Sequence, residues 1–146
     1  MCSSDLYLIS GQPLTIRIGY EAAHAVADVV CGITVYDNKG VILFGSNTDN
    51  LGIELDCIKG SGEIAFILAD VPLLDGSYPV TIGLHSHDEA TVYDWSEQRH
   101  TFEVMSPTRD IGVLQFHVDV AVNGRLQTPR LTQRNLEAEI AESNHN

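Results

Sequence analysis

Hydrophobic and polar positions alternate over short runs along most of this chain. Residues 14–20 (LTIRIGY) place an apolar side chain at every second position, which is typical of a strand with one buried face. Turn signals such as DNKG at 37–40 and NG at 123–124 occur between or after such runs. Further runs cover residues 29–36, 41–44, 64–68, 77–86, 100–104 and 113–120. The pattern, with no convincing helix between the runs, predicts an all-β fold, an immunoglobulin-like antiparallel β-sandwich.

Composition divides the chain into three parts. We expect an N-terminal linker over residues 1–10, the β-sandwich domain over residues 11–121 and a polar C-terminal tail over residues 122–146. Thr132 could cap a short helix within the tail. Because apolar positions are sparse there, a frayed tail is the alternative.

Alternation also assigns each strand side chain to one of two faces. The apolar faces predict these core residues: Tyr78, Val80, Ile82, Leu84, Phe102, Val104, Leu114, Phe116, Val118 and Val120. The opposite faces carry polar side chains that can hydrogen-bond a hydroxyl-rich ligand: Thr34, Tyr36, Thr81, His85, Gln115 and His117. Because their strands can be neighbours in an immunoglobulin-like sheet, we expect these six candidates to share one polar sheet face.

The charge balance narrows the choice of ligand. The chain has a net charge of −12 and only two lysines, Lys39 and Lys59. Nucleic acid and anionic lipid both require a basic surface, so these partners are disfavoured and a neutral ligand stays open. The cysteines, Cys2, Cys31 and Cys57, are odd in number and form no C-x-x-C motif. A cytosolic setting is therefore favoured over a disulfide framework.

His85 and His87 are the best metal candidates, since strand residues two apart point to the same side. Metal-binding jelly rolls of the cupin type add a glutamate four or five residues later, where this chain has Thr91 and Val92. The glycine expected before the pair is replaced by Pro79. We therefore expect no metal, and the two imidazoles are either exposed strand-end groups or ligand contacts. A small metal-dependent enzyme built on this pair is the alternative.

Trp95 is the only tryptophan, and it lies in the stretch 83–100 that we expect to be a strand end followed by a loop. An exposed indole can stack on the apolar face of a sugar ring, whereas a buried indole closes the end of a sandwich. Burial of Trp95 is the favoured interpretation. Four acidic residues of the same stretch are expected on a solvated surface and not in acid–base catalysis: Asp88, Glu89, Asp94 and Glu97.

Several stretches occur together in the order found in one known domain family. They are LTIRIGY at 14–20, GITVYDNKG at 32–40, FGSNT at 44–48, LLDGSY at 73–78, and YDW at 93–95 followed by FEV at 102–104. In that order they resemble the C-terminal domain of Wzt-type ATPases of polysaccharide ABC exporters. The resemblance spans about residues 11–120, and the F-G-x-N-T and L-L-x-G-x-Y elements are its most specific parts.

The resemblance implies a cytoplasmic β-sandwich that binds the polysaccharide to be exported, often of the O-antigen type. It also implies a homodimer that acts with a nucleotide-binding domain and a membrane permease, peripheral to the inner membrane. No cofactor is expected, and the chain has no P-loop motif, so we expect no enzymatic activity. An adhesion or dimerisation sandwich without a small ligand is a further alternative.

Overall fold

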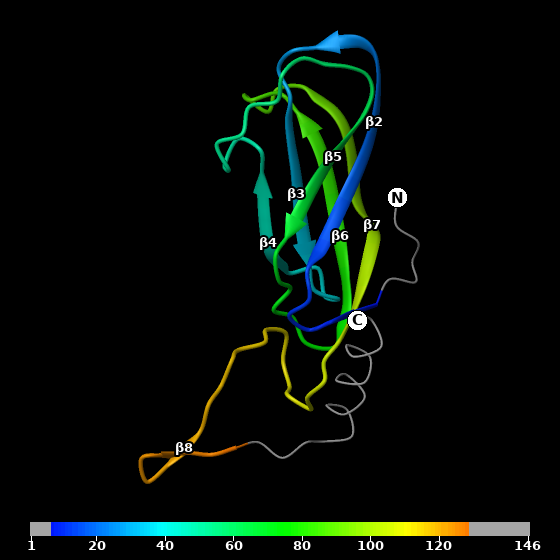
Figure 1. The fold of residues 1–146 in the computed structure, drawn as a ribbon. Coiled ribbons are helices and arrows are strands. Elements are labelled where there is room, and N and C mark those ends of the chain that lie inside the picture. Colours follow the sequence, from blue (N-terminus) through cyan, green and yellow to red (C-terminus); the bar gives the residue numbers. More distant parts are fainter. Residues whose placement is uncertain (1–6, 129–146) are drawn as a thin grey trace, which may run out of the picture.

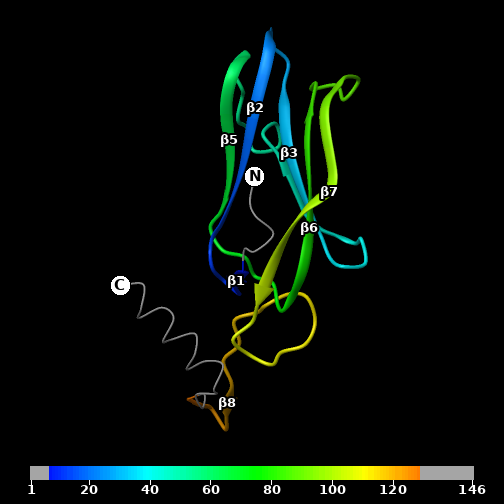
Figure 2. The same cartoon turned by 90° about the vertical axis from the view of Figure 1, so that its right-hand side faces the viewer.

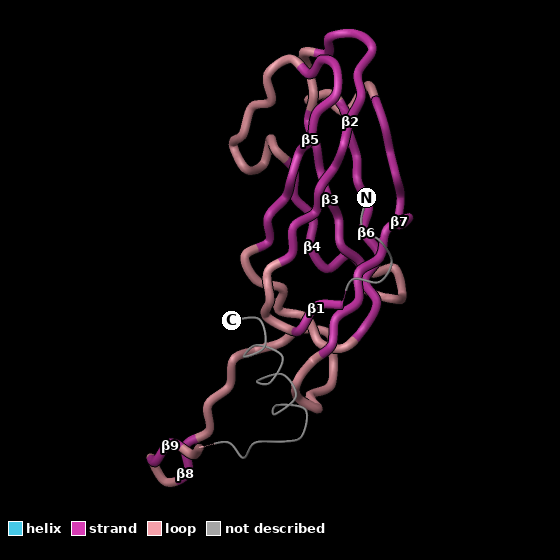
Figure 3. Tube along the Cα trace, turned by 45° about the vertical axis from the view of Figure 1, so that its right-hand side comes forward, coloured by secondary structure: helices cyan, strands magenta, loops and turns pink. Residues whose placement is uncertain are grey.

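Nine strands make up the described part of the chain, residues 7–128, in the computed structural model (Figure 1). In chain order they are β1 (Tyr7–Ile9), β2 (Leu14–Val26), β3 (Val30–Tyr36), β4 (Ile42–Asn47), β5 (Ile58–Leu68), β6 (Gly76–His85), β7 (Val92–Met105), β8 (Ala121–Val122) and β9 (Arg125–Leu126). No helix occurs among the described residues, so the all-β prediction is confirmed (Figure 3). The helix considered at Thr132 lies outside them.

Two sheets face each other and form the sandwich (Figure 2). The first sheet has five strands in the order β1-β7-β6-β3-β4, and the second contains only β2 and β5. Neighbouring strands are antiparallel except β1, which runs parallel to β7 with Leu8 opposite Val104. The immunoglobulin-like sandwich prediction is confirmed, with one parallel edge strand inside the stretch that we assigned to a linker.

The core lies between the sheets, where their apolar faces meet. The rings of Tyr78 and Phe102, on β6 and β7, have centroids 5.5 Å apart. The buried hydroxyl of Tyr78 donates to the carbonyl oxygen of Leu74 at 2.6 Å, which removes the cost of an unpaired polar group. The predictions for β6 and β7 are confirmed, because these side chains are buried or packed against the buried cluster: Tyr78, Val80, Ile82, Leu84, Phe102 and Val104.

Residues 113–120 do not form the predicted seventh strand, apart from one bridge between Leu73 and Leu114. Phe116 and Val118 are 75% and 70% exposed, and Leu114 and Val120 are also exposed, so their assignment to the core is wrong. The segment runs away from the body of the sandwich towards the β8–β9 hairpin (Figure 1). Alternation indicates that one face of a segment favours burial, but it does not indicate which surface buries that face.

β7 begins at Val92, earlier than predicted, so most of the stretch assigned to a loop is strand. The register shifts at Tyr93 and again at residues 97–99, which lie opposite the single residue Thr81. Gln98 has a φ of 50°, which re-aims the backbone at this bulge. Extra residues interrupt the period of two, and this is why the sequence pattern placed the strand start too late.

Both predicted turns are confirmed. The carboxylate of Asp37 accepts two backbone N–H groups at 2.8 Å each, and Gly40 has a φ of 83°, which glycine adopts without strain. This turn joins β3 to β4. Asn123 and Gly124 have φ values of 50° and 79° and join β8 to β9.

Phe102→Ala is expected to lower the free energy of unfolding by about 3–5 kcal/mol, because the missing ring leaves a cavity between the sheets. Ile111→Ala is the matched control, since Ile111 is 95% exposed, and it should change that free energy by less than about 0.5 kcal/mol. Urea unfolding followed by circular dichroism measures both. Equal effects would contradict the position of Phe102 in the core.

Candidate functional site

Three glycines on three neighbouring strands leave the centre of the outer sheet face without side chains. Gly32 of β3 is paired with Gly83 of β6, and Gly83 is paired in turn with Trp95 of β7. Gly45 lies on β4, the next strand after β3. A Cβ atom added to Gly32 would lie only 3.1 Å from the Cβ of Asn47. Glycine inside a strand weakens it and marks a place where another group approaches the backbone closely.

At Gly83 the approaching group is the indole of Trp95. A Cβ atom added to Gly83 would lie 2.6 Å from Cζ3 of Trp95, so a side chain there would displace the ring. Trp95 is nevertheless 51% exposed, and the prediction that it is buried is wrong. The ring rests against the bare backbone of β6 with one side and is open to solvent on the other.

A hollow of about 200 Å³ lies beside this ring, and we call it the glycine hollow. Its lining consists of Gly32, Ile33, Thr34, Gly45, Ser46, Asn47, Asn50, Thr81, Gly83, His85 and Trp95. The floor of glycines and the two asparagines were not among the residues predicted from the sequence. Glycines in the interior of three strands were the available signal, but only the register shows that they lie side by side.

Asn47 and Asn50 form the end of the hollow that is remote from Trp95. The Oδ1 of Asn47 accepts the backbone N–H of Asn50 at 2.7 Å, which leaves the side-chain NH₂ of Asn47 as a donor. Thr48 anchors this corner to β3, since its hydroxyl accepts the N–H of Cys31 at 3.2 Å and its own N–H donates to the Cys31 carbonyl at 2.9 Å.

Four of the six predicted site residues lie together on this outer face: Thr34, Tyr36, Thr81 and His85. Gln115 and His117 do not join them. They lie in the segment beyond the Leu114 bridge and line a different cavity at the end of the sandwich. The expectation that all six share one sheet face is therefore corrected, because it depended on a strand at 113–120.

Thr81 is not available to a ligand in the way we expected, because it is only 2% exposed. Its Oγ1 accepts the N–H of Gln98 at 3.0 Å and donates to the hydroxyl of Tyr36 at 3.3 Å. Because Gln98 lies in the bulge of β7, its N–H is not part of the regular hydrogen-bond ladder between β6 and β7. The bond to Thr81 provides the acceptor that this N–H needs. Thr81 thus supports the shape of β7 and positions Tyr36.

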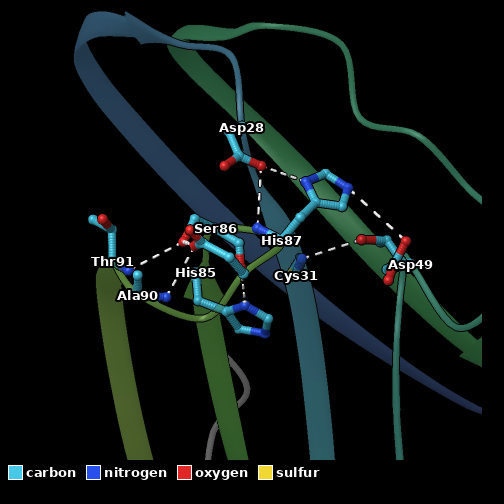
Figure 4. Close-up of polar contacts among 10 residues, drawn as sticks. Asp28, Cys31, Asp49, His85, Ser86, His87, Ala90 and Thr91 are labelled. Atoms are coloured by element: carbon cyan, nitrogen blue, oxygen red, sulfur yellow. Dashed lines mark hydrogen bonds and ion pairs between the residues drawn. The ribbon is translucent and has the colours of Figure 1, made fainter.

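Figure 4 shows that His85 and His87 point away from each other. His85 ends β6, and its Nδ1 donates to the carbonyl oxygen of Ser86 at 2.6 Å. The ring of His87 lies beyond the strand end and bonds to Asp28. Side chains two residues apart point to the same side only within a strand. Because β6 ends at His85, the imidazoles of His85 and His87 do not converge. Within residues 7–128 no group of three or more His, Cys, Asp or Glu residues is arranged to hold a metal ion.

The lining of the glycine hollow combines one aromatic ring with amide, hydroxyl and imidazole groups. Neither lysine nor arginine lines it in the described part of the chain. Such a surface suits an uncharged ligand that has an apolar face and several hydroxyl groups. It offers no pair of carboxyl groups for acid–base chemistry.

Residues 3–116 match the Wzt C-terminal domain family. The chain belongs to this family. The crystal structure of the C-terminal domain of Wzt has the same fold, with a TM-score of 0.69 and 20% sequence identity over 79% of this chain and 72% of that chain. No curated protein matches this chain.

Membership of the Wzt C-terminal domain family supports a role in the ABC-transporter system of polysaccharide export. Domains of this family are non-catalytic parts of ABC-transporter proteins. Between residues 7 and 128 no helix is long and apolar enough to cross a membrane.

Thr81→Val keeps the shape of the side chain but removes its hydroxyl, and it leaves the N–H of Gln98 without this partner. We expect it to lower the free energy of unfolding by about 1–3 kcal/mol. Thr101→Val, an exposed change on the same sheet, should cost less than about 0.5 kcal/mol. If thermal and urea unfolding give the same result for both variants, Thr81 has no supporting role at the bulge.

Proposed function

We propose that this Wzt C-terminal domain is a non-enzymatic carbohydrate-binding module that recognises a cell-surface polysaccharide of the O-antigen type at the glycine hollow. The observation that supports it is the half-exposed indole of Trp95 over Gly83. An indole held against a strand has a fixed orientation, so a sugar ring can stack on it with little loss of side-chain entropy.

The polar lining supplies the hydrogen bonds that such a ligand needs. Thr34 and His85 stay candidates for direct contact, and Asn47 and Asn50 join them from the remote end of the hollow. Tyr36 is outside this lining but stays a candidate on the same sheet face, where its hydroxyl bonds to Thr81. Each bond to a sugar hydroxyl contributes about 1 kcal/mol. Thr81 acts in this proposal through Tyr36, and Gln115 and His117 have no part in this hollow.

A neutral sugar unit fits this surface better than an acidic one. The residues that line the hollow are flanked in sequence by acidic neighbours, Asp49 beside Asn50 and Asp94 beside Trp95. With a net charge of −12 and neither lysine nor arginine in the described lining, a carboxylate on the sugar would be repelled. The volume of about 200 Å³ is below the roughly 300 Å³ of a drug-sized pocket, which suits a single sugar unit.

In the proposed setting the domain is cytoplasmic and peripheral to the inner membrane, where it acts with a nucleotide-binding domain and a membrane permease. Family membership supports this assignment. The hollow faces outward from the sheet and is therefore reachable by a long chain that is bound through one of its units.

Trp95 is the only tryptophan, so its fluorescence reports on the glycine hollow directly. We expect methyl β-D-glucopyranoside, whose ring hydroxyls are all equatorial, to change Trp95 emission with a Kd in the millimolar range, about −4 kcal/mol. The corresponding methyl glucuronide has the same ring with a carboxylate and should bind at least about tenfold more weakly. Stronger binding of the glucuronide would contradict a site for neutral sugars.

Affinity gels that contain the producing cell's surface polysaccharide test the same site with the polymer. Gly83→Ala and Trp95→Ala should both remove retardation, the first because its Cβ displaces the indole. Tyr93→Ala is the matched control, since Tyr93 is exposed on the same strand but does not line the hollow. Unchanged retardation of Gly83→Ala and Trp95→Ala would place polysaccharide binding elsewhere.

We further propose that the domain forms a homodimer in which residues 116–122 of one copy cover a groove of the other. The groove measures about 710 Å³, opens between the sheets beside β4 and β5, and is lined largely by apolar side chains such as Val35, Phe44 and Phe66. The exposed, alternating side chains Phe116 and Val118 offer a matching apolar face. Apolar surfaces of this extent on one chain favour association.

Val118→Asp should therefore convert a dimer into a monomer, because a carboxylate would be buried in the apolar groove. His117→Asp is the matched control on the other face of the same segment, and it should stay dimeric. Sedimentation equilibrium distinguishes a mass near 16.0 kDa from twice that value. A wild-type protein that sediments as a monomer at micromolar concentration would refute the homodimer.

A further inference from the structure

Three loops at one end of the sandwich meet at the imidazole of His87. His87 belongs to the β6–β7 loop, and its Nδ1 and backbone N–H both bond to the carboxylate of Asp28 in the β2–β3 loop, the latter at 3.1 Å. Its Nε2 lies 3.9 Å from an oxygen of Asp49 in the β4–β5 loop. Figure 4 shows the ring between the two carboxylates. One side chain thus connects loops that are far apart in sequence.

The β4–β5 loop also contributes to the lining of the glycine hollow, through the residue that follows Asp49. Asn50, which lines the hollow, follows Asp49 directly, and its N–H is bonded to Asn47. The turn continues with the N–H of Leu51 on the carbonyl of Asn47 at 3.1 Å and the N–H of Ile53 on the carbonyl of Thr48 at 2.8 Å. A force on Asp49 therefore acts on the same turn that positions Asn50.

The charged groups that act on His87 in the described part of the chain are carboxylates. Asp28 faces it from the β2–β3 loop, Asp49 and Glu54 from the β4–β5 loop, and Asp88 from its own loop. The hydrogen bond to Asp28 raises the pKa of His87 above its ordinary 6.5, and the charges of Asp28, Asp49 and Glu54 act in the same direction. The same hydrogen bond lowers the pKa of Asp28 below its ordinary 3.8. The two shifts describe one ion pair.

We propose that His87 is a pH-sensitive latch that holds the β4–β5 loop, and with it the Asn50 end of the glycine hollow. When the imidazole is protonated, its charge lies between Asp28 and Asp49 and offsets their mutual repulsion. When it is neutral, two carboxylates of neighbouring loops face each other without a cation between them. The loop then loses the ion pair between Asp49 and His87, and the Asn50 turn opens more often.

The direction of the pH dependence follows from the raised pKa. The latch is complete below pH 6.5, where His87 is protonated and the carboxylates around it are ionised, and it is lost as the pH rises through the raised pKa of His87. The effect of the latch on ligand affinity rests on the proposed function, since only a ligand bound in the glycine hollow would contact Asn50. Its effect on the loop does not depend on any ligand.

Hydrogen exchange of the ligand-free protein tests the loop itself. The protection factors of the Leu51 and Ile53 amides, corrected for intrinsic exchange, should fall roughly threefold or more between about pH 5.5 and pH 9. The amide of Gly40, bonded to the carbonyl of Asp37 at the far end of the sandwich, is the internal control and should keep its protection. Equal protection of Leu51 and Ile53 at both pH values would overturn the latch.

Two variants separate the latch from a general loosening of the fold. Asp49→Asn keeps the shape of the side chain and removes the charge that His87 attracts, so protection of Leu51 should become independent of pH. The imidazole of His87, followed by NMR, should still titrate above its ordinary range because Asp28 is unchanged. A pH dependence that persists in Asp49→Asn would mean that His87 does not act through this contact.

Titration of Trp95 fluorescence with methyl β-D-glucopyranoside gives the second readout. Affinity should be roughly threefold weaker at about pH 9 than at about pH 5.5 in the wild type, and equal at both values in Asp49→Asn. A loop that loses protection while affinity stays constant would overturn the link between the latch and the hollow. Absence of any glucoside binding, with the loss of protection intact, would refute the proposed function and leave the loop latch supported.

Discussion

A two-stranded sheet cannot cover the inner face of a five-stranded sheet, and much of this structure follows from that mismatch. β2 and β5 bury the central positions, where Ile33 and Val35 become almost inaccessible. Beside β4 and β5 the sheets leave the groove of about 710 Å³. The hydrophobic effect penalises such a surface in water, and the same chain exposes the apolar side chains of Phe116 and Val118. The second sheet has too few strands to cover the first, and the segment that contains Phe116 and Val118 does not pack into the sandwich. Both features leave apolar surface exposed to water.

The outer face of the large sheet differs from the apolar inner face. It lacks side chains at its centre and contains the glycine hollow there. Gly32, Gly45 and Gly83 contribute no side chain to the sheet, and the bulge at residues 97–99 of β7 interrupts its ladder. Each feature weakens a sheet locally. The buried hydroxyl of Thr81 offsets part of this cost by satisfying the N–H of Gln98. Side chains of the chain itself occupy part of the space that the glycines leave, since Trp95 lies against Gly83 and Asn47 against Gly32. The glycine hollow lies between these two side chains.

The loops at the end of the sandwich place acidic side chains close to the glycine hollow, because Asp49 precedes Asn50 in the β4–β5 loop. An excess of acid gives a net charge of −12, and His87 lies where carboxylates of different loops approach each other. An imidazole in such surroundings gains a proton more readily than in water, so its charge responds to pH in a range where carboxylates do not. The position of Asn50 then depends on an ion pair as well as on the hydrogen bonds of its own turn.

Much of the fold could be predicted from the sequence, and the candidate site could be predicted only in part. The turns at Gly40 and at Asn123-Gly124 are local, since a positive φ restricts which residues can occupy the position. The alternation in β6 and β7 predicted the core side of Tyr78 and Phe102, because the two faces of a strand follow directly from its pleat. The family could also be predicted, from stretches that carry these same turns and core positions.

Other features depend on partners that are distant in sequence, and only the tertiary structure decided them. Trp95 lies on the outer sheet face because its partner on β6 is Gly83, which has no side chain and leaves room for the indole. This pairing depends on the bulges of β7. His85 and His87 diverge because β6 ends between them. Phe116 has the pattern of a core residue but is largely exposed, because residues 115–120 pair with no strand in the described part of the chain. The sequence by itself determined which faces are apolar and where the chain turns, since both are local properties. Which face meets which partner depends on register and strand order, and these arise only when the whole chain packs.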